Sequence, residues 1–425
     1  MTRKTASSTD GTPNFSATPS SEVVICKEGE IMLEIIVPTT GAHNHYRCSR
    51  TILQSQSEYF NVLLDPIKFS EGIAIEAKVF ELSKHYTDHA SMPASKLPSV
   101  IVSDVGQLPK ACISLNTVIR LFLNILHDPA TPWPVPRSQS ISLVVLLAII
   151  ADRLAAIRPI KEYLRAQRLD TTLLKDKKGG TAYKLELDNR QRLLAGLIFG
   201  FPSWVRQCSA TLIIDGPQRR PTTNMDSGGD EEAEDHALWW TLPNGVEEEL
   251  VCRRTYVLGT ISSVQKHFLD LYIKRPQCRL GYGSSPQCDS FQLGQMLRFL
   301  TRKGSITMES TLSPALEEPE LYNGNIIDII ARLRECPSYQ IDENHSHCGL
   351  RTRLLPILDR LELGQVAMCL TCWEEDRVKE SWLESPWQGS WEFKKRDRGM
   401  GCQEHRKAKE MYTAAERDWT PVQPG

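Results

Sequence analysis

The last third of the 425-residue sequence holds the residues best suited to bind a metal ion. Thiolates and neutral imidazoles are the side chains that Zn²⁺ prefers in structural sites. Seven of the twelve cysteines and three of the ten histidines lie here: Cys278, Cys288, Cys336, Cys348, Cys369, Cys372, Cys402, His345, His347 and His405. This concentration predicts a metal-binding region.

Two short pairs in this region have the spacing of zinc ligands. Two residues lie between Cys369 and Cys372, which lets thiolates of one turn bind the same Zn²⁺ at about 2.3 Å each. Cys402 and His405 repeat this gap after a further 29 residues. We therefore predict a structural zinc site formed by these four residues.

An alternative set of ligands lies upstream. His347 and Cys348 precede a predicted helix, LRTRLLPILDRL, and folding that helix back would bring them to Cys369 and Cys372. Cys336 is a further ligand in this alternative. The number of ligands also allows two zinc ions, and buried free thiols are the alternative without metal.

A catalytic use of these residues is less favoured. A catalytic cysteine needs a base and a group that orients the base. These three side chains could be supplied by Cys348, by His345 or His347, and by Asn344. However, side chains adjacent in sequence seldom face one another, and no glycine turn that would form an oxyanion hole accompanies them. GxxxxGK[ST], GxGxxG after a strand, HExxH and GxSxG are also absent, so we expect no enzyme.

Basic and aromatic residues near Cys402 suggest nucleic-acid binding as a second function. Such residues contact phosphates and stack on bases. Acidic residues interrupt the cluster, which favours a solvated helix face with ion pairs instead. The residues are Trp382, Trp387, Trp391, Lys394, Lys395, Arg396, Arg398, Arg406, Lys407 and Lys409.

The composition is that of an ordinary globular protein. It is 41% hydrophobic and 24% charged, and the net charge of −2 gives no global attraction to nucleic acid or anionic membranes. The longest apolar run, Leu143 to Ala151, is far shorter than the ~20 residues that span a bilayer. Residues 1–21 are polar and lack a secretory signal, so we expect a disordered lead and an intracellular location, cytoplasmic or nuclear, with reduced cysteines.

The N-terminal part predicts strands followed by helices. Residues 23–27 and 31–37 are rich in β-branched residues and predict a hairpin. Residues 46–72 predict two short helices with one apolar face, the first capped by Ser49 and the second by Ser55 or Ser57. The side chains expected to pack there are Leu53, Tyr59, Phe60 and Leu64.

Helical patterns dominate the rest of the chain. A short strand is expected at 100–102, followed by helices at 118–128 and from 141 to 165. Residues 186–208 predict a helix and then a tight aromatic turn, and residues 246–273 predict a long amphipathic helix or a helix pair. Residues 176–180 and 222–235 are expected to be a linker and a solvated acidic loop.

The order of residues in the N-terminal part resembles the signature of the BTB/POZ domain. The matching pattern is Tyr46-x-Cys48-Ser49-x-x-x-Leu53, Ser57-x-Tyr59-Phe60-x-x-x-Leu64 and Phe69-Ser-Glu71-Gly72. Residues 108–109, 118–128 and 141–165 continue the resemblance, while Ser49, often His in that family, and a long insertion at about 73–99 depart from it. The string NHSHCGLRTRLLPILD also resembles a segment in a group of uncharacterised fungal proteins that carry a BTB-like domain.

The resemblance implies an α/β (α+β) BTB-like domain at 22–170, before a helical spacer domain at 180–275 and a Cys/His-rich domain at 276–425. It implies protein partners, through self-association as a homodimer or through docking, and in some family members an adaptor role on a cullin ubiquitin ligase. The expected function is therefore non-enzymatic protein–protein interaction. The alternative is a zinc-dependent nucleic-acid-binding transcriptional regulator that uses the first domain to dimerise.

Overall fold

The computed structural model divides the chain into two compact units. The first comprises Met1–Pro136 and Leu146–Gln167, and the second comprises Arg137–Val145 and Arg168–Gly425. The structure describes residues 22–37, 42–103, 105, 108, 113–136, 139–174, 181–217, 237–278, 280–281, 283–302, 322–361, 363–393 and 401–420. The expected lead at 1–21, linker at 176–180 and acidic loop at 222–235 lie outside these residues.

The first unit contains a mixed four-stranded sheet with the order β1-β3-β2-β4. Its strands are β1 (Glu22–Val24), β2 (Ile31–Val37), β3 (Ala42–Cys48) and β4 (Ser99–Val102). The predicted hairpin between the first two strands is wrong: β1 runs parallel to β3, with Val23 opposite Tyr46, and β2 runs antiparallel to β3.

The sequence pattern did not predict strand β3, because the first half of the strand is polar. At its end, Tyr46 and Cys48 alternate as buried apolar residues, and the Arg47 side chain between them is buried as well. We expected the helical stretch to begin at Tyr46, but residues 46–48 belong to this strand. The Arg47 carbonyl accepts hydrogen bonds from the amides of Ile25 and Cys26, which hold the first segment on β3.

The two short helices after the sheet form as predicted. They are α1 (Arg50–Gln56) with Ser49 at its N-cap and α2 (Glu58–Leu63) with Ser57 at its N-cap. The Ser57 hydroxyl accepts a hydrogen bond from the Phe60 amide and donates one to the Leu154 carbonyl at 2.6 Å. Leu53, Phe60 and Leu64 are buried, while Tyr59 is partly exposed and packs edge-on against Phe60.

The insertion at 73–99 is more ordered than a surface loop. Its first part continues helix α3 (Ser70–Ser83), and two short 3₁₀ helices, η1 (His89–Ser91) and η2 (Ala94–Lys96), follow. Met92 and Leu97 are buried against Met32 of the sheet. These two apolar side chains, which lie within the largely polar sequence SMPASKLPS, anchor the segment to the sheet.

Three longer helices complete the first unit, and one of them is shared. Helix α4 (Leu115–His127) is capped by Ser114, whose side chain accepts a hydrogen bond from the Thr117 amide. Helix α5 (Ser140–Arg153) begins in the second unit and ends in the first, and α6 (Ile157–Ala166) follows it.

The second unit is mainly helical. Its helices and strands are α7 (Leu169–Thr172), α8 (Ala182–Phe199), α9 (Pro202–Asp215), α11 (Val246–Lys274), α12 (Ser285–Arg302), α14 (Ile326–Arg334), η5 (Glu343–His345), α15 (Leu350–Arg360), η6 (Leu363–Gln365), α16 (Leu370–Glu375), α17 (Arg377–Glu380), β5 (Ser390–Glu392), α18 (Cys402–Thr413) and β6 (Glu416–Asp418). Strands β5 and β6 pair in parallel. Residues 246–274 thus form one helix, not a pair, and the expected aromatic turn at 201–205 instead starts α9 after Gly200.

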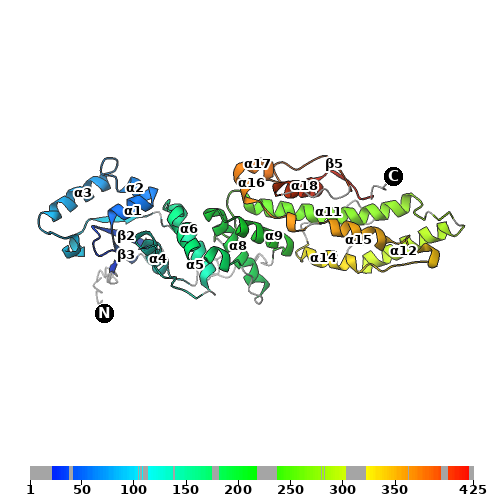
Figure 1. The fold of residues 1–425 in the computed structure, drawn as a ribbon, viewed down its shortest axis with the longest axis horizontal. Helices are drawn as coiled ribbons and strands as arrows, with labels where there is room; N and C mark the ends of the chain where they lie inside the picture. Colours follow the sequence, from blue (N-terminus) through cyan, green and yellow to red (C-terminus); the bar gives the residue numbers. More distant parts are fainter. Residues whose placement is uncertain are drawn as a thin grey trace, which may run out of the picture. The chain divides into compact units, whose positions relative to one another are not determined.

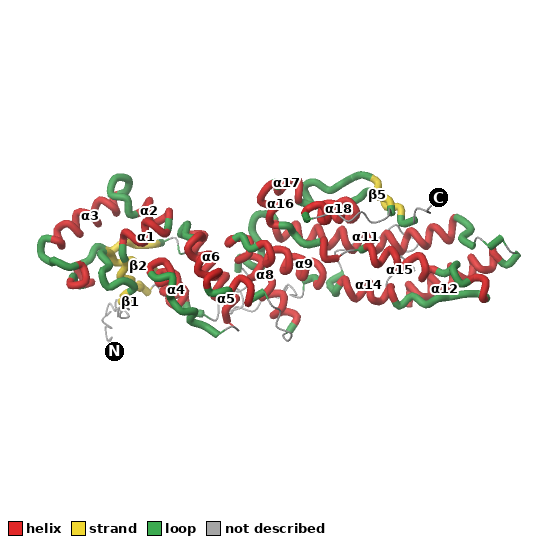
Figure 2. The backbone as a smooth tube through the Cα atoms, in the orientation of Figure 1, coloured by secondary structure: helices red, strands yellow, loops and turns green. Residues whose placement is uncertain are grey.

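Helix α11 is the central element of the second unit. It packs against α9, α12 and α18, and α18 lies along one side of it in Figures 1 and 2. The segments expected to be a spacer domain and a C-terminal domain lie together in this unit, since both pack on α11. Among the described residues, no helix is both long enough and apolar enough to cross a membrane.

Candidate metal centres

Two groups of four potential metal ligands lie in the second unit. We call Cys278, Cys288, His345 and Cys348 site A, and we call Cys369, Cys372, Cys402 and His405 site B. Within each group, the ligand atoms lie within 4.8 Å of one another. Each group offers three thiols and one imidazole, which is a donor set of structural zinc sites.

Site B unites the two pairs predicted from their spacing. Cys369 is the N-cap of α16 and Cys372 lies in its first turn, while Cys402 and His405 lie one turn apart at the start of α18. Gly401 precedes Cys402 with φ of +59° and ψ of −127°, a conformation that favours glycine. Local helix geometry therefore sets each pair. The two pairs meet because α18 packs on α11 while α16 packs on α9, which itself packs on α11.

The backbone before Cys369 is held by a buried arginine. The Arg253 guanidinium on α11 donates hydrogen bonds to the carbonyls of Val366 and Ala367 at 3.1 and 2.8 Å. The amide of Met368 donates to the Ser209 hydroxyl at 2.9 Å. These contacts fix the position of the first cysteine pair.

A carboxylate lies behind the histidine of site B. His405 Nε2 is 3.4 Å from Glu380 Oε2, and Glu380 Oε1 is 3.3 Å from Arg253. Burial raises the pKa of Glu380, but the contacts with His405 and Arg253 lower it overall. Zinc-binding histidines commonly have such a carboxylate partner, so this contact fits a metal site.

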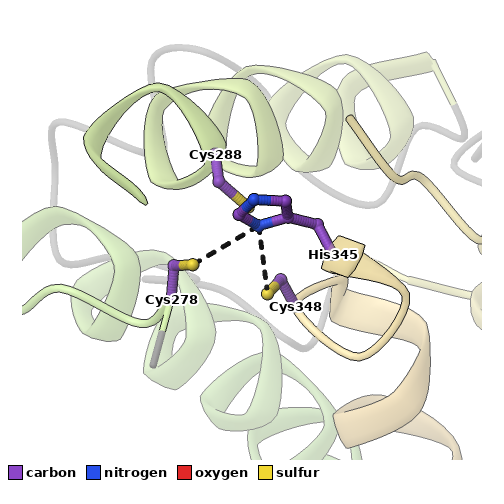
Figure 3. A group of neighbouring side chains, drawn as sticks. All are labelled: Cys278, Cys288, His345 and Cys348. Atoms are coloured by element: carbon purple, nitrogen blue, oxygen red, sulfur yellow. Dashed lines mark hydrogen bonds between the residues drawn. The ribbon is translucent and has the colours of Figure 1, made fainter. Parts of the chain in front are cut away.

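Site A is more deeply buried than site B. Cys288 and His345 are completely buried, and Cys278 and Cys348 nearly so. His345 Nδ1 lies 3.4 Å from Cys278 Sγ and 3.7 Å from Cys348 Sγ, and Figure 3 shows all four side chains facing one another.

Hydrogen bonds hold the backbone of site A on both sides. The Asp289 carboxylate accepts from the amides of Gln277 and Cys278 at distances of 2.9 to 3.1 Å. The Tyr272 hydroxyl donates to the Cys348 carbonyl at 2.5 Å. Both ends of the ligand set are thus anchored to α11 or α12.

Burial favours the protonated form of three of these thiols. It raises the pKa of Cys288 and of Cys372 to about 12, and it raises the pKa of Cys348 as well. Burial also acts to raise the pKa of Cys278, but hydrogen bonds, first that from Ser285, lower it overall. A divalent cation would offset the burial of thiolates by direct charge attraction.

The upstream alternative ligand set is not brought together. Cys348 lies in site A, and neither Cys336 nor His347 belongs to either group of the described residues. Cys336 is buried with its thiol 3.7 Å from the Pro337 carbonyl, and His347 is exposed. The turn at 345–348 explains this, because residues three apart share a side and His347 points elsewhere.

Sequence reasoning did not identify the ligand set of site A. One available signal was the His345-x-x-Cys348 pair, which mirrors the Cys402-x-x-His405 pair. Nine residues lie between Cys278 and Cys288, and 56 residues lie between Cys288 and His345. Spacing alone does not connect such distant pairs.

The structure bears on two other sets of residues singled out above. Of the residues considered for a catalytic cysteine, His345 faces Cys348, but the thiols of Cys278 and Cys288 share the same enclosed site. Trp382 is fully buried and stacks on Tyr412, so it does not offer a face to a base. Lys409 donates to two backbone carbonyls, and residues 394–400 lie outside the described part of the chain.

Comparisons with known proteins gave no match: no family, curated protein or solved structure was found to be similar to the chain. The class of protein is therefore defined by its own features. It has a mixed sheet with helices, then a mainly helical unit with two Cys/His groups compatible with metal binding.

Proposed function

We propose that this chain is a non-enzymatic protein–protein interaction protein whose BTB-like first unit docks a protein and whose second unit is stabilised by structural zinc. One observation supports docking most directly. Large apolar side chains are exposed along α3 and just before it: Ile67 (87%), Phe69 (42%), Ile73 (54%) and Phe80 (64%). We call these four residues the α3 stripe.

The α3 stripe follows helical spacing. Phe69, Ile73 and Phe80 are separated by four and seven residues, so they share one face, while Gly72 and Ile75 face the unit's interior. Exposed apolar residues that are contiguous mark interaction surfaces in soluble proteins. The occupant that fits is the apolar surface of a second copy or of another protein, as the BTB/POZ resemblance implies. A cullin scaffold is one such protein.

The donor set of site B favours a structural role for a bound zinc ion over a catalytic one. Catalytic zinc keeps an open coordination position, whereas three thiolates and one imidazole fill a tetrahedron. Site B therefore holds α16 and α18 together and leaves no place for a reacting water.

The docking proposal is tested with the double variant Ile73→Glu, Phe80→Glu in the full chain. Charges on the α3 stripe abolish docking without disturbing the core, since both side chains are exposed. Sedimentation measures self-association, and affinity capture followed by mass spectrometry identifies partners such as a cullin. We expect at least a tenfold loss of self-association or of a captured partner, with an unchanged unfolding temperature.

Ile327→Glu is the matched control. Ile327 is 52% exposed on α14 of the second unit, and a glutamate suits that helix's first turn. This variant is expected to behave as wild type. A wild-type chain that stays monomeric and captures the same proteins as the double variant would refute the proposal.

A further inference from the structure

We infer that site A is a second structural zinc site, independent of site B, in which His345 binds the ion through Nδ1. Its ligands come from three places: the residue Cys278 after α11, Cys288 in α12, and the pair His345 and Cys348 before α15. A zinc ion there stabilises the end of the second unit at which these segments meet. The inference does not depend on the proposed docking function.

The spacing of the ligand atoms fits a tetrahedral zinc ion. Bonds of about 2.3 Å to sulfur and about 2.0–2.1 Å to nitrogen, at tetrahedral angles, place sulfur and nitrogen about 3.6 Å apart. The two measured sulfur–nitrogen separations, 3.4 and 3.7 Å, bracket this value. Both distances involve Nδ1, which identifies the nitrogen that faces the ion.

The other nitrogen of His345 has the surroundings of an outer coordination shell. His345 Nε2 lies 3.5 Å from the Ser284 hydroxyl and 3.8 Å from the Asp342 carboxylate. With Nδ1 bound to zinc, Nε2 carries the proton, which the Ser284 hydroxyl can accept, while the Asp342 carboxylate lies just beyond hydrogen-bond distance. A structural histidine buried in an apolar core would not need this arrangement.

The site has no vacant place for a substrate. Four protein ligands complete the coordination, and all four are buried. The ion closes a loop of the chain from Cys278 to Cys348, so its binding free energy adds directly to the stability of the fold.

The test is zinc stoichiometry of the purified full chain by native mass spectrometry and elemental analysis. We expect two zinc ions per wild-type chain and one in Cys288→Ser. Cys336→Ser is the matched control, because Cys336 is equally buried but outside both sites, and it should retain two ions. His345→Cys should also retain two, since four thiolates form a zinc site as well.

The outcome is decisive even when Cys288→Ser does not fold. Cys372→Ser removes the ion of site B, so the zinc that remains reports on site A alone. One retained ion supports the inference, and none overturns it. A wild-type chain without zinc, or Cys288→Ser with as much zinc as wild type, overturns it as well. If site B alone does not bind zinc, the wild-type chain holds one ion. Cys372→Ser then keeps this ion, and Cys288→Ser loses it.

Discussion

Single buried residues connect site B to the core of the second unit. Arg253 is completely buried on α11 and contacts Glu249 at 2.6 Å and Glu380 at 3.3 Å. Glu249 also accepts hydrogen bonds from the Ser381 hydroxyl and the Trp382 amide. Through Glu380 this network reaches His405, so one guanidinium links the long helix to the proposed zinc ion.

Replacement of Arg253 by methionine should destabilise the second unit strongly. The change leaves the buried carboxylate of Glu249 without its cation, which typically costs about 3–5 kcal/mol. Urea unfolding followed by tryptophan fluorescence measures this loss. Arg158→Met is the control, because the exposed pair of Arg158 with Glu162 contributes at most about 1 kcal/mol. Equal stabilities of the two variants would contradict the role of the network.

His127 should make the stability of the first unit depend on pH. Its Nε2 accepts a hydrogen bond from the Ser49 amide, and its Nδ1 donates to the Leu123 carbonyl, so the folded unit needs the neutral ring. Burial lowers the pKa of His127, although the contact with Leu123 opposes this. The unfolded chain therefore binds a proton more readily, and stability present above about pH 6.5 is lost as pH falls below it.

His127→Gln isolates this effect because glutamine has no charge at any of these pH values. Thermal unfolding is measured between about pH 7.5 and pH 5. We expect the variant to be less stable than wild type near neutral pH and to lose less stability on acidification. A parallel decrease for wild type and variant would show that other groups cause the pH dependence. The exposed residue His89 offers the control His89→Gln, which should follow wild type.

At the scale of elements, α11 is the most important. It runs 29 residues, with Glu247 to Glu249 in its first turn and Lys274 in its last, charges that suit the helix dipole. Its glycine, Gly259, would have no atom within 4 Å of an added Cβ. The helix therefore tolerates a side chain at that position.

Gly259→Ala should stabilise the second unit, and Gly216→Ala should destabilise it. Alanine in a helix interior is favoured over glycine by about 0.5–1 kcal/mol. Gly216 ends α9 with φ of +73°, and an added Cβ would lie 2.6 Å from the Arg254 guanidinium, which binds the Ile213 and Tyr322 carbonyls. We expect a loss of more than about 1 kcal/mol there. Urea unfolding monitored by circular dichroism compares the pair, and opposite signs are required.

At the scale of the molecule, both candidate zinc sites lie in the second unit. Metal removal should therefore act on that unit alone. The first unit has its own core, built from the sheet and the helices around Leu53 and Phe60.

Chelation should lower the unfolding temperature of the second unit and leave that of the first unchanged. A zinc ion held by the proposed sites binds the folded unit more tightly than the unfolded chain, so its removal withdraws binding free energy from folding. Calorimetry detects the transitions, and hydrogen exchange of peptides around Cys288, Cys402 and Tyr46 assigns them to units. Added Zn²⁺ should reverse the shift, while added Mg²⁺ should not. Equal shifts in both units would contradict the placement of the metal sites.

The sequence by itself determined the features that depend on neighbouring residues. The Ser49 N-cap, the helical character of residues 246–273 and the ligand pairs Cys369–Cys372 and Cys402–His405 follow from spacings within one or a few turns. These spacings carry a signal because helix geometry relates residues three or four apart.

Only the tertiary structure decided which distant segments meet. It paired β1 with β3, placed Met92 and Leu97 in the core, and brought Cys278 and Cys288 to His345 and Cys348. The meeting of the four site A residues depends on the packing of α12 on α11 and on the hydrogen bond from Tyr272 to Cys348. Such meetings depend on the balance of all contacts across a long loop, which no local spacing records.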